Sequence, residues 1–477
     1  MTMFNIVLVT VDCLRYDRCG FNGHDRNTTP VLDALANESY VFDNAYATGP
    51  YTTESVPGII AGQHSYNGAH FGEHLAWKAI PTESRTVASY LSDNGYSTAA
   101  SLTNPHITRD RNFDNGFDTF RNLERGDGET DETDSDGQES SWGRSMMNAV
   151  LSKSRSRLRD QRMLVNPYVA AYVAYRYAQV QSGWPTIPAE RVIREAVAEF
   201  EILTEPFFVW THLMDLHAPI RPQTAQEGGL AGGGRTTTYL ISDAARASQI
   251  HTPMYKSIYD SALRYVDSCL REIIDELRRH GQWDNTVLIL SSDHGEALYD
   301  RNETYGHPRH YLYDELLHVP LLIRLPGLDG ERIEQPVSLA WMHELIAEVL
   351  ELPRGEFAAR SGVETLLSNS DDDRNYVVSD TLDGGGHSIS VRDDRHKLLS
   401  HRNGYETHDE EYEYFGQDVL IQYSTDVGER VPLSRSDRPE LRAVANELHS
   451  DPESHPRIAG RFEPEVEERL RDLGYRI

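Results

Sequence analysis

The amino-acid sequence predicts an α/β fold, in which helices flank a large mixed, mostly parallel sheet. Continuous apolar, β-branched runs recur along the chain, and each is typical of a strand that is buried on both faces. Helical patterns lie between these runs, as expected for parallel strands joined by crossovers. From about residue 375 the runs become short and alternating, which predicts a smaller antiparallel sheet. We therefore expect a large domain at residues 1–360 and a small C-terminal α+β subdomain at residues 375–477.

The large domain is expected to begin with a strand at Asn5–Val11, where almost every residue is apolar or β-branched. A helix follows, for which Thr29 can serve as the N-cap and Pro30 suits the first turn. A long helix is expected over residues 253–280, because apolar residues repeat there at helical spacing and Gly281 provides a stop. Further buried strands are expected at residues 207–210, 286–290 and 319–325.

The remaining segments differ in character from these runs. Short alternating stretches at residues 375–379 and 388–392 predict strands of the smaller sheet. Residues 464–473 predict a final charged helix. The segment at residues 124–141 is acidic, rich in Gly and Ser and poor in apolar residues. We expect this acidic segment to form a solvated, mobile loop.

The composition limits the classes of partner. The chain carries 75 Asp+Glu against 46 Lys+Arg, a formal net charge of −29, and 39% of its residues are hydrophobic. This apolar content supports a sizeable core, and the charge disfavours nucleic acid and anionic lipid as partners. The only lysines are Lys78, Lys153, Lys256 and Lys397. Such a surface resembles those of salt-in haloarchaeal proteins, in which concentrated salt screens carboxylate repulsion. An ordinary acidic protein with high-GC codon bias is the alternative.

Cysteine use and hydropathy predict the cellular compartment. A disulfide framework is not expected, because the three cysteines are scattered and odd in number. Met1 leads almost directly into the first strand, without the basic segment or cleavage site that marks a secretory leader. No apolar stretch approaches the roughly 20 residues that span a bilayer. We therefore expect a cytoplasmic protein without a membrane span.

Polar groups that suit a metal ion follow two of the expected strands. Asp12 ends the first strand, and Asp293 and His294 follow the strand expected at residues 286–290. In open α/β sheets, sites form beyond the carboxyl ends of the strands, so these side chains are expected to share one crevice. Carboxylates with an imidazole suit a divalent cation. Taken singly, Asp12 could instead cap a helix, and the Asp293–His294 pair could belong to a polar loop.

A segment near the N-terminus resembles the signature of the sulfatases in the alkaline phosphatase superfamily. It reads Thr-Thr-Glu-Ser-Val-Pro-Gly-Ile-Ile-Ala-Gly and ends at Gly62. The family signature is Cys/Ser-x-Pro-Ser-Arg with a glycine six residues further on. Counting back from Gly62 places Thr52 at the nucleophile, Ser55 at the motif serine and Val56 at the arginine. Other family motifs are matched in the same order, at residues 11–15, 207–219, 291–296, 318–327 and 390–397.

The resemblance implies a metal-dependent hydrolase with an alkaline phosphatase/sulfatase-like fold. Asp12, Asp293 and His294 would hold one divalent cation that also binds Thr52. Thr52 would be a metal-activated nucleophile that forms a covalent intermediate. Thr53 is the rival nucleophile, and a Thr/Ser-rich helix cap is the purely structural alternative. Threonine cannot yield the formylglycine of the usual sulfatases, so none is expected. Mn, Ca and Zn are all compatible with this ligand set.

The resemblance also implies a set of substrate contacts. His217 matches the histidine that contacts the transferred anion or acts as a general acid on the leaving oxygen. His212 lies in the same segment. Arg309 stands where the family has a lysine, and its forked donors suit a sulfate or phosphate. Asn104 falls where another family lysine would stand. The alternatives to the arginine are His307 and His310.

We therefore expect a hydrolase of sulfate or phosphate esters that takes a small-molecule or carbohydrate-type anionic ester. One alternative is a phosphodiesterase or phosphoglycerol-transferase-like enzyme of the same superfamily, which a threonine nucleophile favours. A two-metal phosphodiesterase would require an Asp-x-x-x-His pair mid-chain, whereas the spacing here is Asp215-x-His217, so one metal is preferred. Another alternative is a catalytically inactive anion- or glycan-binding member of the fold, because Thr52 and Val56 depart from the signature. The sequence does not indicate the oligomeric state.

Overall fold

The structure is a computed structural model of the chain. It describes residues 3–75, 77–124, 185–231, 252–301, 304–361, 364–368, 376–403, 412–424, 428–433 and 438–473. The predicted acidic loop at residues 124–141 lies outside these residues, apart from Glu124.

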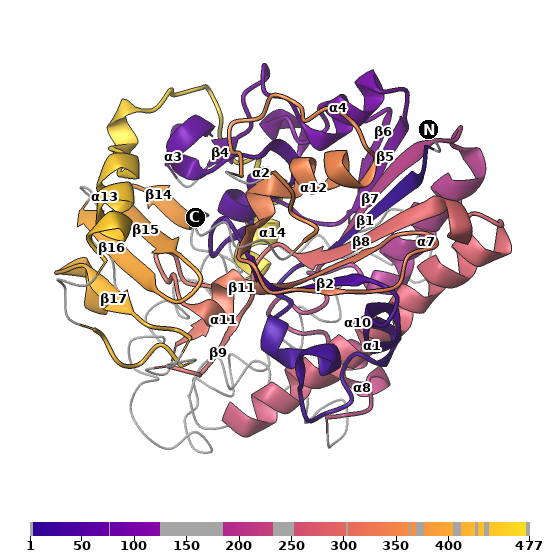
Figure 1. Ribbon diagram of the computed structural model, residues 1–477, viewed down its shortest axis with the longest axis horizontal. Helices are drawn as coiled ribbons and strands as arrows, with labels where there is room; N and C mark the ends of the chain where they lie inside the picture. The colour runs from indigo at the N-terminus through magenta and orange to yellow at the C-terminus, as the bar shows by residue number, and fades with distance from the viewer. Residues whose placement is uncertain are drawn as a thin grey trace, which may run out of the picture.

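A mixed sheet forms the centre of the described part of the molecule (Figure 1). Its strands are β1 (Asn5–Val11), β2 (Tyr40–Tyr46), β5 (Ser97–Leu102), β6 (Thr119–Asn122), β7 (Phe207–Leu213), β8 (Thr286–Ser292), β11 (His318–Arg324), β12 (Arg332–Ile333) and β13 (Val337–Ser338). The strand order is β12-β2-β11-β8-β1-β7-β5-β6, and β13 also pairs with β2. Only β11 among these strands is antiparallel to its neighbours. The predicted mixed, mostly parallel sheet is therefore confirmed.

The four strands predicted in the large domain all lie in this sheet. β1 has the predicted bounds, β7 and β8 extend further toward their carboxyl ends, and β11 begins one residue earlier than predicted. The strands β2, β5 and β6 were not predicted from the sequence. In β2, Asp43 and Asn44 occupy partly exposed positions and interrupt the apolar pattern. β5 is built mostly from Ser and Ala, which have little strand propensity of their own.

Helices cover both faces of the sheet, which explains the continuous apolar runs. In β1, Ile6 and Leu8 pack into one core, whereas Val7 and Val9 pack into the other. The first core lies under α2 (Thr52–Ala61), α4 (Val87–Asp93) and α12 (Met342–Val349), and the second lies against α1 (Pro30–Ala36), α7 (Ala189–Ile202), α8 (Pro222–Glu227) and α10 (Thr252–Arg279) (Figure 1).

A separate antiparallel sheet follows in the C-terminal part, as predicted. Its strand order is that of the sequence, namely β14 (Val377–Asp383), β15 (Gly386–Arg392), β16 (Lys397–Asn403) and β17 (Val419–Ile421). Helix α13 (Pro439–Leu448) packs on this sheet through Leu441 and Ala445. Helix α14 (Pro464–Leu473) has the predicted bounds and returns to the first part of the chain, where Leu470 and Leu473 cluster with Tyr51 (Figure 1).

Short elements complete the described part of the chain. They are the helices α3 (Ser65–Gly68) and α11 (Asp314–Leu317) and the two-stranded ribbons β3 (His70–Phe71) with β4 (Lys78–Ala79) and β9 (Ala297–Leu298) with β10 (Tyr305–Gly306). Across the ranges described, a helix with the length and apolar character needed to cross a bilayer is not found.

The start of helix α1 differs from the prediction. The Thr29 side chain does not cap the helix; its hydroxyl donates to Asp33 Oδ1 at 2.9 Å. The cap comes instead from Asp267 in α10, whose carboxylate accepts hydrogen bonds from Val31 N and Leu32 N at 2.9 Å each. Asp267 is 236 residues from Val31 in the sequence, so a local pattern could not identify it.

Replacing Asp267 with Ala is expected to lower the free energy of unfolding by about 2 kcal/mol, because two backbone donors lose their acceptor. Burial raises the pKa of Asp267 from 3.8 to about 6. The folded protein therefore keeps a proton that the unfolded chain releases between about pH 4 and 6, and this contribution to stability falls as the pH rises through that range. Urea unfolding at several pH values measures both effects.

The matched control is Asp275→Ala, an exposed carboxylate on the same helix. We expect it to change the free energy of unfolding by less than about 0.5 kcal/mol. Equal effects of the two substitutions would contradict the assignment of Asp267 as the cap.

Candidate active site

Asp12 and Asp293 lie close together because they follow two neighbouring parallel strands. Val11, the last residue of β1, pairs with Ser292, the last residue of β8. The next residue of each strand therefore reaches the same edge of the sheet. The Asp12 backbone N–H also donates to Leu213 O of β7 at 2.8 Å, which fixes the direction in which the chain leaves β1.

The turn after Asp12 is tightly held. Cys13 has a φ of 65°, in the left-handed region that a non-glycine residue rarely occupies. The Tyr259 hydroxyl from α10 donates to Cys13 O at 2.6 Å and accepts from Arg15 N at 3.1 Å. The Cys13 thiol lies 3.0 Å from Asp12 Oδ1 and 3.2 Å from Glu296 Oε2, and donates toward both. These contacts keep the Asp12 carboxylate in place.

His294 and His212 complete a buried cluster around the two carboxylates. His294 Nε2 lies 3.5 Å from Asp293 Oδ2 and 3.8 Å from Asp12 Oδ1. His212 Nε2 lies 3.6 Å from Asp12 Oδ2. Possible ligand atoms of Asp12, His212 and Asp293 all lie within 4.8 Å of one another. The structure thus places His212, which the sequence analysis assigned to the substrate, beside the carboxylates.

The charges of this cluster fit a divalent cation. Asp293 Oδ2 is buried and accepts no hydrogen bond from the residues that the structure describes. Burial and the neighbouring Asp12 both raise the pKa of Asp293. Burial also opposes ionisation of Asp12, but the hydrogen bond with His212 and the charge of His294 hold the pKa of Asp12 well below its usual range. Two buried carboxylates favour a positive charge between them, and their oxygens with an imidazole nitrogen suit such an ion.

Thr52 lies at the edge of the cluster. It is the first residue of α2, and its Oγ1 is 3.5 Å from His294 Nε2. Ser55, one turn further along α2, donates its hydroxyl hydrogen to Asp293 O. The rival Thr53 donates to Glu54 Oε2 at 3.0 Å. The structure therefore brings together the four residues that the sequence analysis assigned to the metal.

His217 and His307 border the same cluster. Their ring centroids are 4.9 Å apart, and the His307 ring is 4.8 Å from that of His294. His307 Nδ1 lies 2.8 Å from Glu296 Oε2. Burial lowers the pKa of His217 to about 4, partly offset by Asp12. His217 is therefore neutral at pH 7 in the protein without substrate, which favours a hydrogen-bond donor over a proton donor in this state.

Arg309 lies beside Tyr51 and is held by a residue of the C-terminal sheet. Its Cζ lies 4.9 Å from the ring centroid of Tyr51, the residue before Thr52. Its Nη1 donates to Asp383 Oδ2, the last residue of β14, at 3.2 Å. His310 Nε2 bonds to the other oxygen of Asp383 at 2.9 Å, and its Nδ1 bonds to Ser388 Oγ at 2.8 Å. His310 is thus held within the C-terminal sheet.

Asn104 contacts the cluster directly. It follows β5, and its Nδ2 donates to Asp12 Oδ2 at 3.1 Å and lies 3.3 Å from His212 Nε2. Its backbone N–H donates to Asn122 Oδ1 at 3.0 Å. Asn104 therefore orients Asp12. The sequence had placed it among the substrate contacts.

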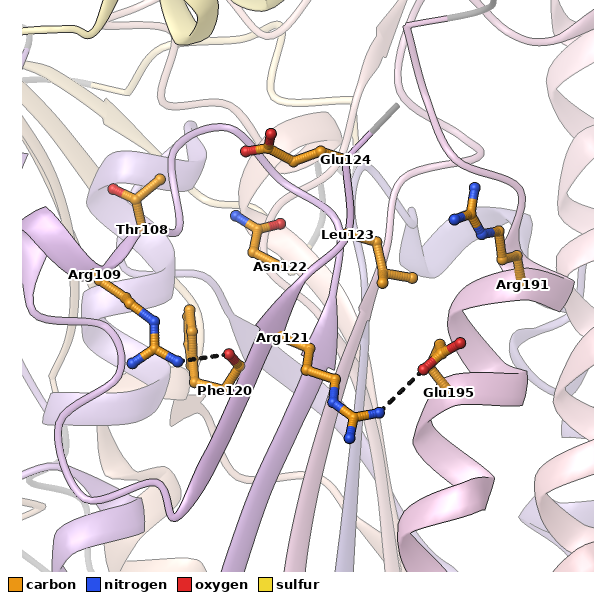
Figure 2. A pocket seen from close by; sticks show the side chains of 9 residues that line it. All are labelled: Thr108, Arg109, Phe120, Arg121, Asn122, Leu123, Glu124, Arg191 and Glu195. Atoms are coloured by element: carbon orange, nitrogen blue, oxygen red, sulfur yellow. Dashed lines mark hydrogen bonds and ion pairs between the residues drawn. The ribbon is translucent and has the colours of Figure 1, made fainter. Parts of the chain in front are cut away.

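A pocket of about 580 Å³ opens beyond Asn122, between β6 and α7. Figure 2 shows Arg109 donating to the Phe120 carbonyl and Arg121 paired with Glu195. The other lining residues are Thr108, Leu123, Glu124 and Arg191. Asn122 lines this pocket and bonds to Asn104, but none of the predicted site residues lines it. The pocket is therefore not the centre of the chemistry.

Several buried polar residues around the site were not predicted from the sequence. Lys78 is buried and donates to Glu54 Oε1 at 2.5 Å and to Ser65 Oγ at 3.2 Å. The scarcity of lysine could have drawn attention to it. Glu296 ends the family motif at residues 291–296 and could have been found there. Asp383 carries no local signal, because its partners are brought to it only by the tertiary fold.

Comparisons with known proteins define the class. The family model described as Sulfatase matches residues 4–353. An arylsulfatase of Clostridium perfringens is 24% identical over 432 residues, which are 84% of this chain and 85% of that protein. The chain belongs to the sulfatase family and is an ester hydrolase of that family.

Two solved structures share the fold. The crystal structure of a phosphonate monoester hydrolase of Agrobacterium radiobacter superposes with a TM-score of 0.60 at 17% identity, covering 93% of this chain and 94% of that one. A structure in complex with its substrate D-glucosamine-2-N,6-O-disulfate superposes with a TM-score of 0.60 at 15% identity, covering 99% and 98%. At these identities the likeness concerns the fold.

Isothermal titration of the chelator-treated protein with Mn²⁺ or Zn²⁺ is expected to show one site per chain. Asp293→Asn is expected to weaken binding at least about 100-fold, because it removes one of two buried charges. Asp284→Asn makes the same change at a side chain that is 96% exposed near the start of β8, and is expected to leave the affinity unchanged. A titration without a tight site, or equal affinities for both variants, would contradict the metal assignment.

Proposed function

We propose that the protein hydrolyses sulfate or phosphate esters with Thr52 as the nucleophile. The observation that carries this proposal is the position of Thr52 Oγ1, 3.5 Å from His294 Nε2 at the edge of the carboxylate cluster. Asp12, Asp293 and His294 would hold one divalent cation there. Such an ion, when bound, lowers the pKa of a nearby hydroxyl and offsets negative charge on the reacting group.

The residues around the cluster support its orientation. His294 Nδ1 lies 2.8 Å from Gly295 O, which leaves Nε2 to face the carboxylates. Asn104 and the Cys13 thiol each hold one oxygen of Asp12. These contacts hold Asp12 and His294 in position before a substrate binds, as catalysis by preorganised charge requires.

In the proposed reaction, Thr52 releases its hydroxyl proton to solvent, and its Oγ1 bonds to sulfur or phosphorus while the bond to the leaving oxygen breaks. The leaving oxygen takes up a proton from solvent and departs as the alcohol. His217 would donate an N–H hydrogen bond to an ester oxygen, and Arg309 would bind a nonbridging oxygen pair of the transferred group. Attack by water then releases sulfate or phosphate and restores the Thr52 hydroxyl. Asp383 acts through Arg309, whose guanidinium it holds against Tyr51.

One observation favours phosphorus over sulfur. Thr52 cannot be converted to formylglycine, so a hydrated aldehyde nucleophile is not available at this position. A threonine alkoxide is the type of nucleophile that we infer for phosphodiesterase-like or phosphoglycerol-transferase-like members of the superfamily. The phosphonate monoester hydrolase with the same fold is consistent with this alternative.

The substrate class that we propose is a small-molecule or carbohydrate-type anionic ester. The structure solved with D-glucosamine-2-N,6-O-disulfate supports the carbohydrate part of this proposal, because that ligand is a sulfated sugar on the same fold.

Thr52→Ala is expected to lower kcat for the preferred ester by at least about 10³-fold, since the nucleophile is removed. Thr53→Ala, which changes the adjacent hydroxyl bonded to Glu54, is expected to stay within about threefold of the unchanged protein. The assays compare 4-nitrophenyl sulfate, 4-nitrophenyl phosphate and bis(4-nitrophenyl) phosphate in high salt, with and without chelator. Turnover that survives Thr52→Ala or chelation would contradict the proposal.

A further inference from the structure

Arg111 is a buried cation that has no carboxylate partner among the residues that the structure describes. It ends a 3-10 turn, Arg109–Arg111, and its exposed fraction is 1%. Its Nη1 lies 3.2 Å from His106 Nδ1 and 3.4 Å from His106 O. Its Nη2 is buried and has no hydrogen-bond partner within the described ranges. Among the described residues, the guanidinium therefore keeps one donor group without an acceptor, which a ligand can use.

The other buried arginines of the described residues are all paired. Arg15 contacts Asp300 at 2.5 Å, Arg392 forms an ion pair with Asp314, and Arg324 contacts Glu38 at 3.6 Å. Such pairing is expected, because a buried charge without a partner strongly destabilises a fold. Burial accordingly lowers the pKa of Arg111 to about 10, which leaves it charged at neutral pH.

The rings of His106 and Tyr51 connect Arg111 with the residue before Thr52. The His106 ring, which contacts the guanidinium, lies 5.8 Å from the ring of Tyr51. Tyr51 precedes Thr52 and carries Arg309 at 4.9 Å from its ring centroid. The rings of Trp77 and Phe462 lie 5.1 and 5.0 Å from Arg111 Cζ. These apolar neighbours exclude water, so an anion at Nη2 would be bound in a site of low dielectric constant.

Two side chains lie between Arg111 and Thr52. His106 Nδ1 lies 3.2 Å from Arg111 Nη1, and the His106 ring lies 5.8 Å from that of Tyr51, the residue before Thr52. An anion at Arg111 would therefore belong to another part of the substrate than the group transferred at Thr52.

We propose that Arg111 binds a second anionic group, a sulfate or carboxylate, on the leaving-group part of the ester. This inference rests on the proposed function of the same site and adds that the preferred substrate carries at least two negative groups. The forked N–H donors of arginine suit a planar or tetrahedral oxyanion. Phe462, from the segment before α14, also borders this subsite.

The test compares 4-nitrophenyl and 2-carboxy-4-nitrophenyl esters, as sulfates or as phosphates according to which class the unchanged protein hydrolyses. Arg111→Gln is expected to lower kcat/KM for the carboxylated ester about 10- to 100-fold and to leave that for the parent ester within about threefold. Arg111→Lys, which keeps the charge, is expected to lose less. Arg109→Gln is the control, because Arg109 is in the same turn but is exposed and paired with Asp114.

Binding of the two phenol products provides a readout that does not require turnover. The Kd of 5-nitrosalicylate is expected to rise about 10- to 100-fold in Arg111→Gln, whereas that of 4-nitrophenol stays unchanged. If the unchanged protein hydrolyses neither ester but shows this difference in binding, the subsite stands and the proposed function fails. Equal losses for both esters and both phenols, no loss at all, or failure of both Arg111 variants to fold would overturn the proposal.

Discussion

The structure depends on one electrostatic constraint, the burial of Asp12 and Asp293 at the ends of adjacent parallel strands. Register forces the two carboxylates to one edge of the sheet, and neither is exposed. Like charges at such short range oppose each other's ionisation unless positive charge lies between them. His294 supplies part of it, but Asp293 Oδ2 accepts no hydrogen bond from the described residues. A divalent cation bound between these carboxylates would resolve this imbalance, and we propose that it does so beside the Thr52 hydroxyl.

Parts that are distant in the sequence serve this centre. The first and largest part of the chain supplies the strands, the carboxylates and the helix that begins at Thr52. The antiparallel sheet contributes Asp383, which holds Arg309 against Tyr51. The final helix packs its leucines on the same tyrosine. The C-terminal part therefore contacts the residues next to Thr52. The division into two domains at residues 360 and 375 stays a prediction.

The sequence sufficed for elements whose cause is local. The apolar run of β1 and the helical spacing of α10 each reflect burial of that segment itself, so their bounds were predicted within a few residues. The grouping of Asp12 with Asp293 was also predictable, because parallel strands share a carboxyl edge. By contrast, β5 has little intrinsic strand propensity and is a strand only because β6 and β7 pair with it. Asp267 and Asp383 act across more than seventy residues, and nothing adjacent to them in sequence signals their partners.

The most direct test of the central claim is a crystal structure of the metal-loaded protein with diffraction data collected at the absorption edge of the bound ion. One anomalous peak is expected within coordination distance, about 2.0 to 2.6 Å, of Asp12, Asp293, His294 and Thr52 Oγ1. An ion bound elsewhere, or an ion in this cluster from which Thr52 turns away, would contradict the account of how this chain acts on esters.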